Sequence, residues 1–157
     1  MTRRGAIHRG ACSLTVVSAL LLAMTAAALA ADAGRVKASR GGAWIERAGV
    51  RLPATVGTPV REDDVIVTGA DGAVGITFAD DSRVSLGPDT MMAIERFAFN
   101  PTTHDGAHET SLRRGTLAAV SGKLARQSPE AMKVRTPAAI LGVRGTEFVV
   151  RTGEPSP

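Results

Sequence analysis

Residues 134–150 read VRTPAAILGVRGTEFVV, and this stretch decides how the end of the chain folds. Pro137 fixes its own φ and biases Thr136 toward an extended conformation. A strand that begins at Met132 should therefore end at Thr136. The sequence predicts a change of direction at this point.

Two glycines shape the second half of the stretch. Gly142 and Gly145 permit a positive φ or a close approach of the backbone that a side chain would prevent. A second strand is expected at Thr146–Arg151. Because residues 137–145 are too many for a two-residue hairpin and few for a helical crossover, the stretch predicts a strand-corner-strand unit.

The pattern upstream of this unit has a period of two. Val74, Ile76 and Phe78 alternate with small or polar residues, as do Val84 and Leu86, which is typical of half-buried strands. Turn-forming pairs separate these runs at intervals of nine residues: Asp71-Gly72, Asp80-Asp81 and Pro88-Asp89. Further strands are expected at 35–39, 43–47, 65–68, 91–97, 110–113 and 116–120, with a turn or short helix at 121–130 and a long exposed loop at 100–109. The sequence predicts a single compact all-β domain of short strands, either a β-sandwich or a solenoid-like meander.

The first thirty residues have the composition of a secretory signal peptide. Three arginines and no acids precede an apolar run, which ends in small residues suited to cleavage between Ala30 and Ala31. An uncleaved membrane anchor is the alternative, and export by the general or the twin-arginine route stays open. We expect a signal peptide at 1–30, the β domain at 31–151 and a disordered tail at 152–157.

Removal of residues 1–30 changes the charge of the protein. The full chain carries 19 basic and 15 acidic residues; 16 basic and 15 acidic residues would remain. A nearly balanced surface offers no electrostatic footprint for nucleic acid or anionic lipid. The single cysteine, Cys12, would also be lost, so no disulfide or thiolate ligand is expected.

The closing stretch resembles the signature of the FecR domain family. Its pattern V-x-T-P-x-A-x-x-G-V-R-G-T-x-F-x-V includes Thr136, Pro137, Gly142, Arg144, Gly145 and Thr146. Residues 57–69 and 74–88 resemble the middle of the same family, with Asp81 at a turn position where the family is expected to place glycine. We expect the signature residues to have a structural role, with Arg144 satisfying polar groups that the corner leaves unpaired.

The resemblance implies a non-catalytic periplasmic module in envelope signalling. FecR-type regulators relay the state of an outer-membrane transporter to an extracytoplasmic-function sigma factor. Few residues precede the apolar segment, so the cytoplasmic sigma-binding domain is expected to be missing and the protein to act through an unknown envelope partner. The alternative is a structural, glycan-binding module of the cell wall, although only five aromatic residues are present and most are predicted to point inward.

Candidate chemistry in the sequence is sparse. His104 and His108 have a metal-ligand spacing, but Gly106 favours a solvated loop, and no cofactor or metal is expected. The aspartates of the nine-residue turns lack the glycine pairs of calcium-binding β-rolls, and turn formation explains them. Ser111 lies near His108 and Asp105 without a nucleophile elbow, so no enzymatic activity is expected.

Overall fold

The computed structural model describes residues 31–143 and 147–153, and this part of the chain is built of strands. The strands are β1 (Gly34–Arg40), β2 (Ala43–Arg47), β3 (Val50–Pro53), β4 (Pro59–Val60), β5 (Val65–Thr68), β6 (Ala73–Phe78), β7 (Arg83–Leu86), β8 (Met91–Phe99), β9 (Gly106–Val120), β10 (Met132–Arg135), β11 (Ile140–Gly142) and β12 (Glu147–Thr152). A five-residue helix, α1 (Lys123–Gln127), and a short 3₁₀ turn, Pro129–Ala131, join β9 to β10. No helix in these residues is long and apolar enough to cross a membrane.

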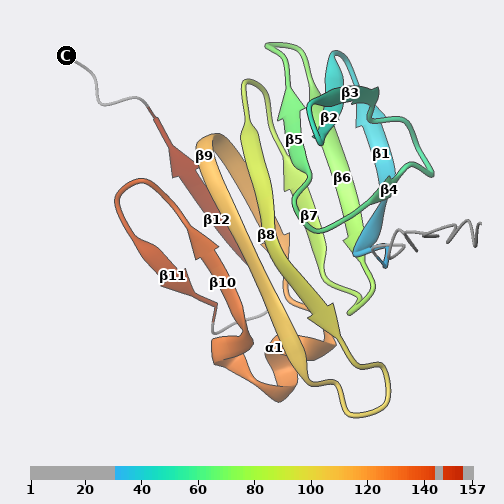
Figure 1. The fold of residues 1–157 in the computed structure, drawn as a ribbon. Coiled ribbons are helices and arrows are strands. Elements are labelled where there is room, and N and C mark those ends of the chain that lie inside the picture. Colours follow the sequence, from blue (N-terminus) through green and yellow to red (C-terminus); the bar gives the residue numbers. More distant parts are fainter. Residues whose placement is uncertain (1–30, 144–146, 154–157) are drawn as a thin grey trace, which may run out of the picture.

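The strands form one curled sheet whose two halves face each other across the core (Figure 1). Sheet A contains β4, β1, β6, β7, the second half of β9, and β12. Sheet B contains β3, β2, β5, β8, the first half of β9, β10 and β11. Strand β9 therefore belongs to both sheets, and all pairings are antiparallel except β9 with β10.

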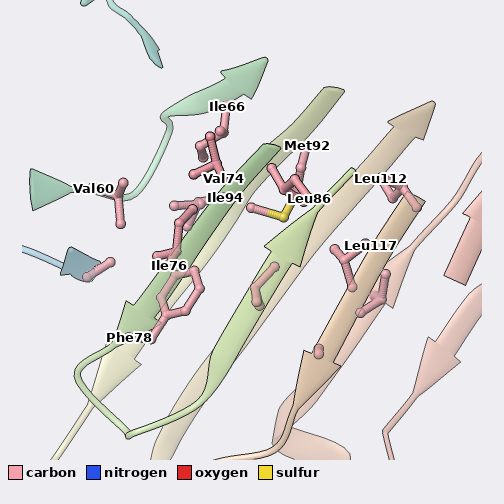
Figure 2. Packing of buried hydrophobic residues seen from close by; sticks show 14 of the residues in the cluster. Val60, Ile66, Val74, Ile76, Phe78, Leu86, Met92, Ile94, Leu112 and Leu117 are labelled. Atoms are coloured by element: carbon pink, nitrogen blue, oxygen red, sulfur yellow. The ribbon is translucent and has the colours of Figure 1, made fainter. Parts of the chain in front are cut away.

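The core lies between the two sheets and is almost entirely aliphatic. Figure 2 shows side chains from β5, β6, β7, β8 and β9 converging in this space. One row crosses sheet B through the paired residues Ile45, Ile66, Met92 and Leu112, all fully buried. Burial of such side chains from water is the main source of stability of the fold.

The two edges of the curled sheet meet at one end, which we call the closed end and define by β2, β3, β4 and residues 54–58. This connection hydrogen-bonds to both sheets: Gly57 N donates to Val36 O of β1, and Ala54 N donates to Ala43 O of β2. The opposite end, formed by β10, β11 and β12, has no such bridge among the described residues. We call it the open end.

The predicted all-β class and the alternation at residues 74–86 are confirmed. Val74, Ile76, Phe78, Val84 and Leu86 are all buried. Strands β2 and β5 have the predicted bounds, and the helix lies within 121–130. Asp81 has a φ of 65°, the conformation for which a glycine would be suited.

Two predictions about the local structure are wrong. The two strands expected at 110–113 and 116–120 are one strand, β9, which begins at Gly106 and replaces the second half of the expected loop 100–109. The strand-corner-strand unit contains a two-residue hairpin at Pro137-Ala138: Thr136 N donates to Ala139 O, and Ala139 N donates to Thr136 Oγ1. The last strand, expected at Thr146–Arg151, is Glu147–Thr152 among the described residues.

Candidate functional site

The signature residues lie at the open end of the sandwich. Thr136 and Pro137 begin the turn between β10 and β11, and Gly142 is the last residue of β11. The φ of Gly142 is not positive, and no described atom lies within 4 Å of the position that a Cβ would take. Within the described part of the chain neither a positive φ nor a close contact accounts for this glycine, and its structural role in the corner stays a prediction.

Most of the other predicted site residues do not belong to the part of the chain that the structure describes. Arg144, Gly145, Thr146 and Ala30 are not among the described residues, so their predicted roles stay predictions. Ala31 is exposed at the beginning of the described chain.

Apolar side chains are exposed at the open end. Ile140 is 58% exposed, Leu141 is 38% exposed and Val149 is 66% exposed, and β11 and β12 carry all three. Two adjoining hollows of about 280 and 530 Å³ lie between these strands, and Leu141 and Val150 line both. The open end thus offers an apolar groove next to unpaired strand edges, which is the kind of surface that binds other proteins.

Strand β11 pairs only with β10 among the strands that the structure describes, which leaves its second edge unpaired there. Val143 N donates to Met132 O, and Thr136 N donates to Ala139 O. Because backbone groups alternate in direction along a strand, those of Ile140 and Gly142 point away from β10. A further extended segment could pair there, as partner strands do in β-augmentation.

The structure also brings together a buried polar cluster that sequence reasoning missed. Asp80, Ser82 and His108 are fully buried, from the β6–β7 turn and from β9. Ser82 Oγ donates to Asp80 Oδ1 at 2.6 Å and lies 3.4 Å from His108 Nδ1. The His108 ring packs against Phe78 and Phe97, with centroids 4.3 and 5.1 Å away.

The order of these hydrogen bonds does not suit catalysis. A serine nucleophile donates its proton to histidine, whereas Ser82 donates to a carboxylate and leaves only a lone pair for His108. Burial lowers the pKa of His108 to about 4, against a smaller raising effect of Asp80. His108 is therefore neutral at physiological pH, and the cluster fastens the β6–β7 turn to β9.

The clusters considered from sequence do not assemble. His108 points into the core, whereas His104 stacks on Phe99 in the β8–β9 loop at 6.0 Å between ring centroids. Ser111 is three residues from His108, so the two lie on opposite faces of β9. Among the described residues, no group of three or more His, Cys, Asp or Glu side chains could hold a metal ion.

An alternating pattern at His108, Thr110 and Leu112 could have signalled that the histidine faces inward. That signal depends on treating residues 106–112 as a strand. The alternating pattern is lost when residues 100–109 are interpreted as a loop.

The closed end is held by a nearly buried ion pair. Arg47 Nε and Nη2 donate to the two oxygens of Asp64, each at 2.7 Å, and Nη2 also donates to Pro59 O at 2.9 Å. Asp64 is fully buried, and its hydrogen bonds raise the pKa of Arg47. The pair joins β2 to the segment that links β4 and β5.

Trp44 lies on the same strand, β2, but is not an open aromatic platform. Its ring is half-buried, and Arg51 covers one face with its guanidinium carbon 4.6 Å from the ring centroid. Glu46 contacts both side chains, accepting from Trp44 Nε1 at 3.3 Å and from Arg51 Nη2 at 3.1 Å. Stacking of a sugar on this face of Trp44 would have to displace Arg51.

Fold and surface together define an all-β module with an apolar, unpaired end and no assembled catalytic centre among the described residues. Residues 64–156 match the family described as FecR protein. The match covers more than half of the chain, and the protein belongs to the FecR family. No curated protein and no solved structure is significantly similar to it. The FecR domain is a periplasmic module of sensing and signalling, and its family is regulatory and non-catalytic.

Proposed function

We propose that this chain is an exported, non-catalytic module whose open end binds an extended segment of another envelope protein during signalling. The family match carries the proposal, because FecR domains belong to sensing pathways. The signal sequence expected at residues 1–30 would deliver the protein to the periplasm. The exposed apolar residues of β11 then supply a surface for the partner.

The features of the open end fit a peptide strand. The backbone groups of Ile140 and Gly142 point to the free edge of β11, and the groove beside Leu141 is apolar. Main-chain hydrogen bonds would supply affinity, and the groove would accept alternate side chains of the partner.

A crosslinking experiment in intact cells tests this function. A photo-crosslinking amino acid at Ile140 is expected to capture an outer-membrane transporter or a membrane-bound sensor. The same amino acid at Val50, which is 57% exposed at the closed end, is the matched control. Capture from both positions, or from neither, would contradict the proposal.

A second arm of the experiment addresses specificity. The substitution Leu141→Asp places a charge in the groove and should abolish capture from Ile140 while leaving the protein folded. Sedimentation with purified peptidoglycan separates the wall-binding alternative: retention of the parent protein in the pellet, together with no crosslinked protein, would favour that alternative.

A further inference from the structure

The last strand, β12, forms a border of sheet A. It pairs with β9 from Glu147 to Thr152, and no other strand among the described residues pairs with it. Figure 1 shows β12 beside β9, at the end of the molecule opposite β1 and β4. Its second edge is therefore a free row of backbone donors and acceptors.

The direction of these backbone groups follows from the bonds of β9. Gly87 N donates to Thr116 O, and Thr116 N donates to Thr90 Oγ1, so the backbone groups of Thr116 face away from β12. Because backbone groups alternate in direction along β9, those of Leu117 face β12, where Leu117 pairs with Val150. The backbone groups of Val149 consequently face the free edge of β12. Those of Glu147 and Arg151 face the same edge.

The side chains at these same positions form a symmetric set. Glu147, Val149 and Arg151 are all exposed on the outer face of sheet A, and Val149 is 66% exposed. Glu147 thus lies two residues before Val149, and Arg151 lies two residues after it. Arg151 Nε donates to Thr116 Oγ1 at 3.2 Å, which keeps the guanidinium on this face.

We propose that two copies of this chain pair through β12, antiparallel and centred on Val149. In this register each Val149 lies opposite the other, and each Glu147 lies opposite Arg151 of the second copy. The backbone groups that face the free edge then bond in register, and sheet A continues across both molecules. A slip by two residues would place Val149 opposite Arg151 and break both ion pairs, so the charges specify the register.

Glu147, Val149 and Arg151 also line the two hollows of the groove, so a second copy and an envelope partner would compete for this end. The dimer can nevertheless be tested with the purified protein alone. A single strand pair buries a small area, and such interfaces are weak. Sedimentation of the purified protein should show a dimer that increases with concentration up to about 1 mM. A protein that stays monomeric over this range would overturn the proposal.

Cysteine crosslinking tests the register. In a Cys12→Ser background the chain has no other cysteine. Directly paired residues have Cα atoms about 5.5 Å apart in this geometry, within the range of a disulfide. Val149→Cys should form a disulfide-linked dimer on mild oxidation, whereas Val56→Cys, with the same 66% exposure in the β3–β4 connection, should not. Equal yields from the two variants would contradict the specific pairing.

Charge reversal provides a second test. Glu147→Arg or Arg151→Glu alone should reduce dimer formation at least about tenfold, because like charges then face each other twice. The double variant should regain most of the association, since each new base again faces a new acid. Glu95→Arg and Lys37→Glu, exposed changes of the same charge elsewhere, are the controls. Failure of the double variant to recover would exclude this register.

Discussion

The two ends of the curled sheet are built on different principles. At the closed end, one connection hydrogen-bonds to both sheets, and the Arg47–Asp64 ion pair fastens β2 to the segment before β5. At the open end, β11 and β12 each pair with a single strand among the described residues, and apolar hollows lie between them. Apolar side chains are exposed at both ends, Ile140 and Val149 at the open end and Val50 and Val56 at the closed end. The comparison indicates that stability is concentrated at the closed end and that the surface available for binding lies at the open end.

The largest effect is expected from breaking the closed end. Arg47→Ala would leave Asp64 buried without its partner, and removal of one member of a buried pair costs about 3–5 kcal/mol. Urea denaturation followed by Trp44 fluorescence measures the loss. Arg51→Ala is the control: its pair with Glu46 is exposed, and the expected cost is below about 1 kcal/mol. Similar losses from the two variants would show that the ion pair does not hold this end.

Acid should weaken both ends together, because His108 lies on β9, the strand that the two sheets share. The pKa of His108 is about 4 in the folded protein, against 6.5 for a solvent-exposed histidine in the unfolded chain, so the unfolded chain binds more protons between these pH values. The free energy of unfolding should fall by about 3 kcal/mol from pH 6.5 to pH 4 through this group, and become independent of it below pH 4.

Denaturation at several pH values checks this, with Trp44 fluorescence reporting the closed end and circular dichroism reporting the whole sheet. His108→Phe keeps an aromatic ring in the core and should remove this part of the pH dependence. His104→Gln, in the β8–β9 loop, should leave it in place. An unchanged slope in His108→Phe would contradict the assignment.

A smaller difference is expected between two glycines. A Cβ on Gly34, in β1, would lie 2.5 Å from Thr77 O and 2.8 Å from the Cα of Phe78, so Gly34→Ala should cost about 1–3 kcal/mol. Gly142→Ala, in β11, adds a methyl group where no described atom lies within 4 Å, and should change stability by less than about 0.5 kcal/mol. Thermal unfolding of both variants measures the contrast. Equal effects would mean that β1 and β11 are packed alike around these glycines.

The smallest change in stability is expected at Ile140. Because its side chain is mostly exposed, Ile140→Asp should alter the free energy of unfolding by less than about 0.5 kcal/mol. Ile45→Ala, in the buried row of the core, should cost about 2–5 kcal/mol in the same assay. A large loss from Ile140→Asp would place this residue in the core and remove the basis for a binding surface at the open end.

Much of the sheet could be predicted because burial imposes a period of two. Val65–Thr68 and Ala43–Arg47 were predicted with their observed bounds, since turn residues flank them. Strand β9 could not be predicted as one element. Gly115 interrupts the apolar pattern with a φ of 92°, and the structure tolerates it because β9 changes sheets nearby.

The candidate site was less accessible from sequence because it depends on pairing between distant strands. The cluster of Asp80, Ser82 and His108 requires the β6–β7 turn to lie against β9, and no local pattern sets that position. The hairpin at Pro137-Ala138 lacks the usual glycine or asparagine. Thr136 Oγ1 supplies the turn contact instead, which the residue types alone did not reveal.

The sharing of β9 has a consequence for the order in which the protein can fold. Strands β7 and β8 each have one neighbour earlier in the chain, β6 and β5, and both obtain their second neighbour only from β9. During synthesis from the N-terminus, one edge of β7 and one edge of β8 therefore stay unpaired and prone to aggregation until β9 has been made up to Val120. The core can therefore close only late in folding. Substitutions that disrupt β9 should first lower the yield of folded protein.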